Sequence, residues 1–309
     1  MYQKFLFALA LLLLSPFFLS VTRAQNTESD TVLVFYLGGQ SNMDGFGYNK
    51  DLGETLESKN EDVWIFHGNP AGDDDSEGGL GLWAALQPGH GTGFSSNGKT
   101  NKLSDRFGVE LSLATRLSEL YPGKRIALVK YSRGGSSIDS LAAGHFGCWE
   151  PDYNGSTGLN QYDYFLRTVK RAMSTPDINE DGRKDILIPA GIFWMQGESD
   201  ASYTEEIAGR YYTNLKRLMD LIRAAFLCDD LPVLIGKISD SWRDESDSKV
   251  WDHGELVQYA QEKYARTDGR AAIVRSTRYY KYSDPWHYNS EGYLDLGRKF
   301  AEAFYGLDH

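Results

Sequence analysis

Residues 32–43 read VLVFYLGGQSNM, and this stretch decides the fold that the sequence predicts. Its first six residues are aliphatic, β-branched or aromatic without polar alternation, which is typical of a strand buried on both faces. Gly38 and Gly39 end the run, and Ser41 follows between polar neighbours. Such a turn can expose a hydroxyl and leave its backbone N–H free, as a nucleophilic serine requires. An ordinary tight turn is the competing interpretation.

Apolar runs alternate with helical patterns along the chain, which predicts an α/β fold with a mainly parallel sheet and helices on both of its faces. We expect strands at 31–37, 62–66, 125–131, 186–194, 232–238 and 271–275, and helices at 105–120, 161–174, 204–226, 251–266 and 290–303. Residues 67–104 are rich in Gly, Asp, Ser and Asn, which predicts a long irregular loop that is functional or mobile.

The first 24 residues have the features of a secretory signal peptide: Lys4, an apolar run, and small residues before an expected cut after Ala24. The run is interrupted at Ser15 and Pro16, which disfavours a retained membrane helix. Residues 25–309 are enough for one large α/β domain. We therefore expect a secreted or periplasmic protein that has no membrane partner after the signal is removed.

The amino-acid composition indicates which kinds of molecule the protein binds. The formal net charge is −11, and loss of Lys4 and Arg23 with the signal makes it −13, which disfavours nucleic acid or an anionic membrane and favours a neutral substrate. The aromatic content of 13% suits sugar-stacking surfaces and core packing equally well. Cys148 and Cys228 either form one disulfide or stay free, and their spacing does not indicate a metal site.

Polar residues follow two further predicted strands, at the edge where open α/β sheets bind ligands. Gly134 and Gly135 come after the third strand and let a backbone N–H face a site without a Cβ in the way. Gln196 and Glu198 come after the fourth; Gln196 offers an amide donor to an oxyanion, and Glu198 is a partner for a histidine. A glycine-rich connection and a helix N-cap are the structural alternatives.

Asp284 and His287 lie three positions apart before the last predicted helix. On a turn, this spacing brings the carboxylate within reach of one imidazole nitrogen, and the other nitrogen is then available for the Ser41 proton. A plain Asp-Pro turn is the alternative. Glu198 remains a rival to Asp284 as the carboxylate that orients His287.

The four segments described above, which contain Ser41, Gly134–Gly135, Gln196–Glu198 and Asp284–His287, resemble in this order the SGNH, or GDSL-like, hydrolase superfamily. Within it they resemble the branch of sialate O-acetylesterases and acetylxylan esterases, carbohydrate esterase family six. Residues 39–43 (GQSNM) look like that branch's nucleophile block, and residues 194–200 (WMQGESD) look like its third block. The resemblance covers roughly residues 31–305. It implies a three-layer α/β/α fold and hydrolysis of acetyl esters on carbohydrates, with no metal or other cofactor in the chemistry.

The resemblance also implies roles for individual residues. Ser41 would be the nucleophile, and His287 the general base and later the acid that protonates the leaving sugar hydroxyl. The oxyanion donors would be the Ser41 N–H, the Gly135 N–H (with Gly134 as the alternative) and the Gln196 side chain. The wider superfamily has Asn in the third block, whereas this chain shares Gln196 with its branch.

A second candidate site lies in residues 177–185 (DINEDGRKD), where oxygen atoms recur at alternate positions around a glycine. The expected ligands are Asp177, Asn179, Asp181, the Arg183 carbonyl and Asp185. Hard cations such as Ca²⁺ bind such rings of oxygen, although Ile188 stands where an EF-hand has its bidentate Glu. The pattern predicts a structural Ca²⁺ remote from the ester chemistry, and a solvated acidic loop is the alternative.

The leading hypothesis is a serine esterase that removes acetyl groups from acetylated xylan or sialic acid. A lipase-like acyl esterase on the same fold is one alternative, and the sequence lacks the long Leu- and Phe-rich lid that would favour it. A carbohydrate-binding protein without turnover is another, disfavoured because binding alone would not need Ser41 and His287.

Overall fold

The computed structural model of this chain describes residues 31–57, 60–72, 75–155, 159–175 and 177–308. The expected signal peptide, residues 1–24, lies outside the described residues. Within the described ranges, no helix is long and apolar enough to cross a bilayer.

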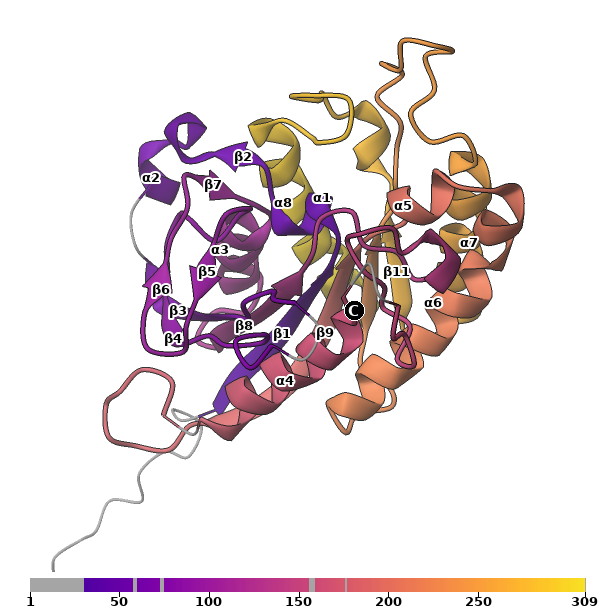
Figure 1. The fold of residues 1–309 in the computed structure, drawn as a ribbon. Helices are drawn as coiled ribbons and strands as arrows, with labels where there is room; N and C mark the ends of the chain where they lie inside the picture. The colour runs from indigo at the N-terminus through magenta and orange to yellow at the C-terminus, as the bar shows by residue number, and fades with distance from the viewer. Residues whose placement is uncertain (1–30, 58–59, 73–74, 156–158, 176, 309) are drawn as a thin grey trace, which may run out of the picture.

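Seven strands of the described chain form one sheet in the order β11-β10-β9-β1-β8-β3-β4. Neighbouring strands are parallel except at one edge, where β4 runs antiparallel to β3. The strands are β1 Thr31–Gly39, β3 Asn60–His67, β4 Trp83–Leu86, β8 Arg125–Ser132, β9 Ile186–Met195, β10 Val233–Gly236 and β11 Ala271–Val274. The central position of β1 brings its C-terminal end between the ends of β8 and β9 (Figure 1).

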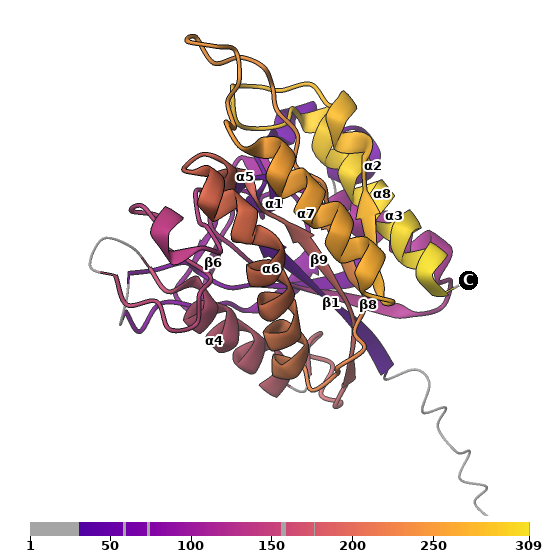
Figure 2. The same cartoon turned by 90° about the vertical axis from the view of Figure 1, so that its right-hand side faces the viewer.

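Helices cover both faces of this sheet, so the predicted three-layer α/β/α arrangement is confirmed (Figure 2). On one face α3 and α8 pack together, and on the other lie α4 and α6, with α7 packed against α6. The main helices are α3 Glu110–Leu120, α4 Gln161–Ser174, α6 Glu205–Ala225, α7 Gly254–Thr267 and α8 Ser290–Asp308. The short helices are α1 Ser41–Asp44, α2 Glu54–Glu57 and α5 Glu198–Ala201, with 3₁₀ turns at Asn49–Asp51 (η2), Ser140–Ala142 (η3) and Ser276–Tyr279 (η4).

The residues of β1 explain why it lies between two helical layers. Phe35 packs edge-on against Phe304 of α8, with ring centroids 5.1 Å apart. The next residue, Tyr36, packs against Phe165 of α4, with ring centroids 4.9 Å apart. Successive side chains of a strand point to opposite faces, so the unbroken apolar run buries both. This packing fixes the place where the turn with Ser41 begins.

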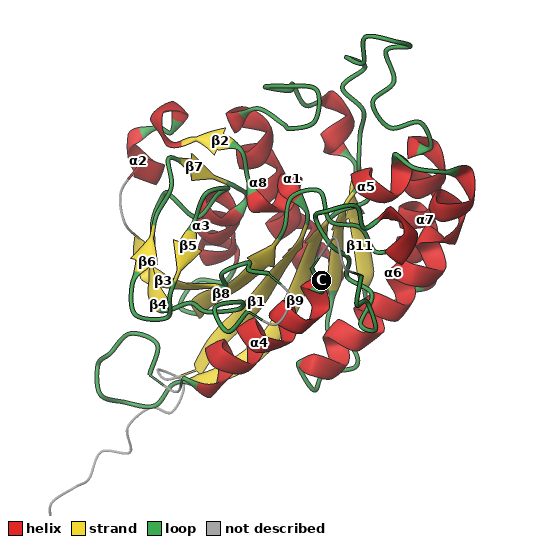
Figure 3. Ribbon diagram, viewed as in Figure 1, coloured by secondary structure: helices red, strands yellow, loops and turns green. Residues whose placement is uncertain are grey.

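Two segments differ from the expected elements (Figure 3). Helix α3 begins at Glu110 and not at 105, because β7 (Arg106–Phe107) pairs with β2 (Gly47–Tyr48). The segment 67–104 is not wholly irregular, because it contains β4 and the hairpin of β5 (Ser95–Ser96) and β6 (Asn101–Lys102). The short β4 is stabilised by Trp83, which packs edge-on against Phe66 of β3.

Candidate active site

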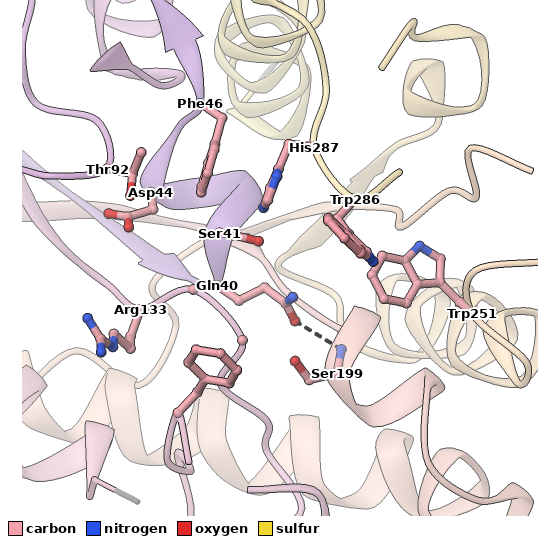
Figure 4. A pocket seen from close by; sticks show the side chains of 13 residues that line it. Gln40, Ser41, Asp44, Phe46, Thr92, Arg133, Ser199, Trp251, Trp286 and His287 are labelled. Atoms are coloured by element: carbon pink, nitrogen blue, oxygen red, sulfur yellow. Dashed lines mark hydrogen bonds between the residues drawn. The ribbon is translucent and has the colours of Figure 1, made fainter. Parts of the chain in front are cut away.

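The C-terminal ends of β1, β8 and β9 meet in register, because Gly39 lies opposite both Ser132 and Met195. The turns that follow them, together with the loop before α8, enclose a cavity of about 550 Å³. Ser41 and His287 both line this cavity (Figure 4). The sheet therefore brings together residues that are more than two hundred positions apart in the chain.

Ser41 is the first residue of α1 and follows β1 through a turn that needs glycine. Gly39 has a φ of +143°, and a Cβ at this position would lie 2.0 Å from the Met195 carbonyl oxygen. The turn therefore passes against the end of β9, and it places the Ser41 side chain on the cavity wall. Glycine is required here because any side chain would push the nucleophile turn away from the sheet.

His287 lies between Asp284 and Ser41. Its Nδ1 is 2.8 Å from Asp284 Oδ2, and Asp284 Oδ1 accepts the backbone N–H groups of Trp286 and His287, each at 2.8 Å. The second ring nitrogen points toward the Ser41 hydroxyl (Figure 4). Phe46 stacks on the imidazole, with ring centroids 3.5 Å apart and planes 5° from parallel, which restricts rotation of the ring.

The surroundings of this pair shift both pKa values downward. Burial lowers the pKa of His287 below its ordinary value, although the hydrogen bond and the charge of Asp284 oppose that shift. Burial alone would raise the pKa of Asp284, but hydrogen bonds from His287 and from the Trp286 N–H lower it overall. At neutral pH the pair is therefore a carboxylate and a neutral imidazole, the state in which a histidine accepts a proton.

Glu198, the rival carboxylate, contacts a different residue. Its Oε1 accepts a hydrogen bond of 2.8 Å from Asn42 Nδ2, and burial raises its pKa to about 7 against the opposing effect of that bond. Asn42 in turn donates to the Trp286 carbonyl at 3.1 Å and accepts from the Tyr288 N–H at 3.3 Å. Glu198 therefore orients Asn42, and Asn42 holds the segment that carries His287.

Gly134 and Gly135 both line the cavity. A Cβ on Gly134 would lie 3.4 Å from the Ser41 Cβ, so this glycine is packed directly against the nucleophile. Gly135 has a φ of +74°, and a Cβ there would lie 2.4 Å from the Phe146 ring. Both positions thus bring backbone, without an intervening side chain, to the wall beside Ser41.

Gln196 does not reach the cavity. Its side chain is fully buried, and Nε2 donates to Asp200 Oδ2 at 2.6 Å and to the Ser136 carbonyl at 3.2 Å. Its Oε1 accepts from the Tyr211 hydroxyl at 2.9 Å. Because these contacts use both amide hydrogens, the geometry does not support the oxyanion role expected for Gln196.

A different glutamine, Gln40, faces the cavity. Its Oε1 accepts from the backbone N–H groups of Gly197 and Ser199, at 3.2 and 3.3 Å. These two donors fix the amide orientation, so the NH₂ group is turned toward the Ser41 side of the cavity (Figure 4). Gln40 is not among the residues that the sequence pattern predicts for the site, although it directly precedes Ser41 in the nucleophile turn.

The remaining side chains that line the cavity are aromatic on one side and mostly polar on the other. Trp251 and Trp286 lie together on one side, and Asp44, Thr92 and Arg133 lie on the opposite side of Ser41 (Figure 4). Trp286 is half exposed. Aromatic rings beside polar groups suit a sugar, whose ring has apolar faces and hydroxyl-bearing edges.

The loop 177–185 lies at the opposite end of β9 (Figure 1). Its oxygen atoms already accept hydrogen bonds: Asp177 from the N–H groups of Asp181 and Gly182, Asp181 from Arg183, and Asp185 from the Ile178 N–H and Arg125. Among the described residues, no group of three His, Cys, Asp or Glu side chains is arranged to hold a metal. The predicted Ca²⁺ site therefore finds no support, and the carboxylates of Asp177, Asp181 and Asp185 are hydrogen-bonded within the chain. Cys148 and Cys228 are both free thiols.

Comparisons with known proteins agree with this fold. The family profile described as carbohydrate esterase, sialic acid-specific acetylesterase, matches residues 31–306. No curated protein matches the sequence significantly.

Three solved structures have similar folds. A protein from Arabidopsis thaliana has a TM-score of 0.59 at 19% identity, with 90% of this chain and 98% of that chain covered. A carbohydrate acetylesterase from Xanthomonas citri has a TM-score of 0.55 at 17% identity, and the alignment covers 88% of this chain and 57% of that longer chain. NanS has a TM-score of 0.55 at 16% identity, with 89% and 97% covered. Since the family profile spans nearly all of the described residues, the chain belongs to the sialic acid-specific acetylesterase family of carbohydrate esterases.

Proposed function

We propose that this protein is a serine O-acetylesterase in which Ser41, His287 and Asp284 form the catalytic triad. Family membership makes it a carboxylic ester hydrolase that acts on O-acetylated carbohydrates. The observation that carries the triad is the position of His287, hydrogen-bonded to Asp284 through Nδ1 and directed at Ser41 through its other nitrogen. Asp284 is then the orienting carboxylate.

In the first half-reaction, the neutral His287 takes the Ser41 proton as Oγ attacks the acetyl carbonyl carbon. The resulting oxyanion collapses, the ester C–O bond breaks, and His287 gives its proton to the departing sugar oxygen. In the second half-reaction, His287 deprotonates a water that attacks acetyl-Ser41, and acetate leaves with regeneration of the hydroxyl. Asp284 stabilises the imidazolium that forms twice in each cycle.

Three donors surround the place where the oxyanion forms. They are the Ser41 N–H, the Gly135 N–H, with Gly134 as the alternative, and the Gln40 side-chain amide. We assign to Gln40 the role first expected for Gln196, because the Gln40 NH₂ faces the cavity while both Gln196 amide hydrogens are used in the protein interior. Removal of one such donor typically costs about 10²- to 10³-fold in kcat.

The acetyl group is proposed to lie on sialic acid or xylan. The cavity of about 550 Å³ accommodates a sugar ring beside Trp251 and Trp286. A lipase-like preference for long acyl chains is tested with p-nitrophenyl esters of increasing length. We expect acetate to be the best substrate, and a rise in kcat/KM from acetate to octanoate would favour the acyl-chain alternative.

We further propose that the protein acts outside the cytoplasm after removal of residues 1–24. Strand β1 begins at Thr31, so a cut after Ala24 leaves the first element of the sheet intact. N-terminal sequencing of the protein recovered from the periplasm or medium tests this cut. An intact Met1 in the exported protein would contradict it.

The triad is tested with Ser41→Ala. We expect acetate release from acetylated sialosides, acetylated xylan and p-nitrophenyl acetate to fall by at least about 10⁴-fold while the thermal unfolding midpoint stays near that of the wild type. A fluorophosphonate should label the wild type and not this variant. The matched control, Ser199→Ala, changes a serine on the same cavity and should keep the label. Near-normal turnover by Ser41→Ala would refute the assignment.

A further inference from the structure

A second cavity adjoins the catalytic cavity at Trp251, which lines both of them. The second cavity has a volume of about 280 Å³ and lies between the segment after β10, the first turns of α7 and the 3₁₀ turn η4. Its other lining residues are Ser239, Asp240, Trp242, Lys249, Gly254, Glu255, Gln258 and Arg278. The catalytic mechanism uses none of these residues.

The segment between β10 and α7 holds the second cavity in a fixed position beside the catalytic loop. It projects beyond the C-terminal ends of the strands (Figures 1 and 2). At its base, Asp240 accepts the Trp242 N–H at 2.7 Å and the Trp251 N–H at 2.9 Å. Ser241 Oγ donates to the Pro285 carbonyl at 2.8 Å, two positions before His287. The wall of the second cavity is therefore tied to the loop that carries the proposed base.

Trp242 has two features that packing does not explain. Its φ is +57°, a backbone conformation that is unusual for a bulky side chain, and its side chain is 59% exposed. Costly backbone conformations of this kind concentrate at sites that bind ligands. An exposed indole offers a flat apolar face on which a sugar ring can stack. Trp242 is therefore suited to contact a ligand in the second cavity.

The polar groups of the second cavity suit a neutral ligand. Two acidic and two basic side chains line it, so their charges balance, and Lys249 Nζ is already paired with Glu255 at 2.8 Å. Gln258 Nε2 donates to the Ile238 carbonyl at 3.1 Å. This contact orients the amide, and an amide oxygen held in this way can accept from a sugar hydroxyl. An aromatic wall beside oriented polar groups matches a sugar ring.

We infer that the second cavity binds a neutral sugar that is joined by a glycosidic bond to the acetylated sugar. The enzyme therefore prefers an acetylated sugar within a glycan over the same sugar alone. This inference rests on the proposed function, because it places the acetyl ester at Ser41. It adds a binding site outside the catalytic cavity, for a part of the substrate that does not react.

The arrangement of the two cavities fits two linked rings. The acetylated ring lies beside Trp251 and Trp286 in the catalytic cavity (Figure 4). The neighbouring ring then passes Trp251 and meets Trp242. A volume of about 280 Å³ is close to the lower limit of ligand pockets, roughly 300 Å³, so the second cavity takes one ring.

Two pairs of substrates test the inference. The first is 3′-sialyllactose O-acetylated on its sialic acid, compared with the methyl glycoside of the same O-acetylated sialic acid. The second is xylotriose acetylated on its middle sugar, compared with the methyl glycoside of the same acetylated xylose. Within each pair the ester is the same and only the neighbouring rings differ. The measured quantity is the ratio of kcat/KM for acetate release, glycan over methyl glycoside, in which a general loss of activity by a variant cancels.

We expect a ratio of about 10 in the wild type for at least one pair, the effect of one stacked ring and one hydrogen bond. Trp242→Asn should bring this ratio close to one, and it keeps the backbone conformation because Asn tolerates a positive φ. Gln258→Met should give an intermediate ratio, because it removes the amide and keeps the indole. The matched control is Tyr259→Asn, which removes an exposed aromatic ring of α7 that lines neither cavity and should keep the wild-type ratio.

A wild-type ratio near one for both pairs, or an unchanged ratio in Trp242→Asn, overturns the inference. Equal release from glycan and methyl glycoside would do so while leaving the proposed function intact. Failure to release acetate from any of the four sugars would overturn the proposed function itself. A preference confined to one pair supports the inference and identifies the sugar that occupies the second cavity.

Discussion

A polar cluster lies at each end of strand β9, and the two clusters differ in whether their polar groups already have hydrogen-bond partners within the chain. At the N-terminal end, the oxygens of Asp177 and Asp181 accept from N–H groups of their own loop. At the C-terminal end, the groups come from β1, β8, β9 and the loop before α8. There the Gln40 NH₂ faces a cavity that Arg133 also lines, and the buried Arg133 Nε has no hydrogen-bond partner among the described residues.

This difference teaches which feature distinguishes a binding site from a stable loop. Both clusters have closely spaced polar residues, and in both the backbone geometry is well determined. A loop that satisfies its own donors and acceptors gains little from a ligand, whereas an oriented and unpartnered group gains a hydrogen bond. The predictions below alter the two ends of β9 in turn.

The largest expected effect distinguishes the role of Asp284 from that of Glu198, the rival carboxylate. Asp284→Asn should lower kcat by about 10³- to 10⁴-fold, because the amide no longer holds the imidazole in the tautomer that accepts the serine proton. Glu198→Gln should cost less than about tenfold, because Glu198 acts on His287 only through Asn42. Steady-state kinetics on p-nitrophenyl acetate measure both. A crippled Glu198→Gln beside an active Asp284→Asn would reverse the two roles.

The next largest effect distinguishes the roles of Gln40 and Gln196, each of which is replaced by Met. Gln40→Met should lower kcat by about 10²- to 10³-fold through loss of an oxyanion donor. Gln196→Met should leave kcat within about tenfold, and should lower the free energy of unfolding by about 1–3 kcal/mol because Asp200 and the Ser136 carbonyl lose their donor. Denaturant titration and kinetics are the two readouts.

Gln40→Glu is the control for this pair. It keeps an oxygen for the Gly197 and Ser199 N–H groups, removes the NH₂ donor and adds a negative charge beside the oxyanion, so its loss of kcat should be at least as large as that of Gln40→Met. If Gln40→Glu retained wild-type kcat, the third oxyanion donor would have to be another group.

A smaller effect concerns pH. The pKa of His287 is lowered chiefly by burial, so the base stays neutral to a lower pH than an exposed histidine would. The acid limb of kcat/KM should therefore fall to half below pH 6.5. The Asp284 carboxylate raises the His287 pKa and so opposes the effect of burial. In Asp284→Asn the His287 pKa should therefore be lower still, and the acid limb of the residual activity should move to a lower pH. A limb that moved to higher pH in this variant would contradict the charge interaction.

The smallest effect is expected at the other end of β9. Asp185→Asn weakens the contact with Arg125, and it should lower the free energy of unfolding by about 1–2 kcal/mol and the melting temperature by a few degrees. Added calcium or EDTA should leave the wild-type midpoint unchanged, because the loop oxygens already have partners. A midpoint that rises with free calcium would show that the loop exchanges these hydrogen bonds for a cation.

The sequence predicts the features that depend on nearby residues. The apolar run before Ser41 predicts a strand buried on both faces, and Phe35 and Tyr36 pack on opposite layers. The spacing of Asp284 and His287 predicts a contact within one turn, and their side chains are 2.8 Å apart. Short sequence separation leaves few conformations for such contacts, so a local pattern is sufficient.

Features that depend on distant partners are not visible in the pattern. The sequence predicts Gln196 as the amide donor, from its place after a strand and from the family resemblance, and does not single out Gln40 beside Ser41. Their roles differ because Gln40 meets the N–H groups at the start of α5, whereas Gln196 meets Asp200 in the interior. The four residues of β4 are likewise too few for the sequence pattern to predict a strand. They form one because they pair with β3.

Asn42 connects the nucleophile turn to segments that are synthesised much later than the turn itself. Its side chain binds Glu198, and its other contacts are Trp286, Tyr288 and Tyr293, all close to the end of the chain. A nascent polypeptide that ends before residue 284 already contains Ser41, but it lacks the segment that supplies the proposed base and holds Asn42 in place. On the proposed roles, the serine is inert until α8 has docked.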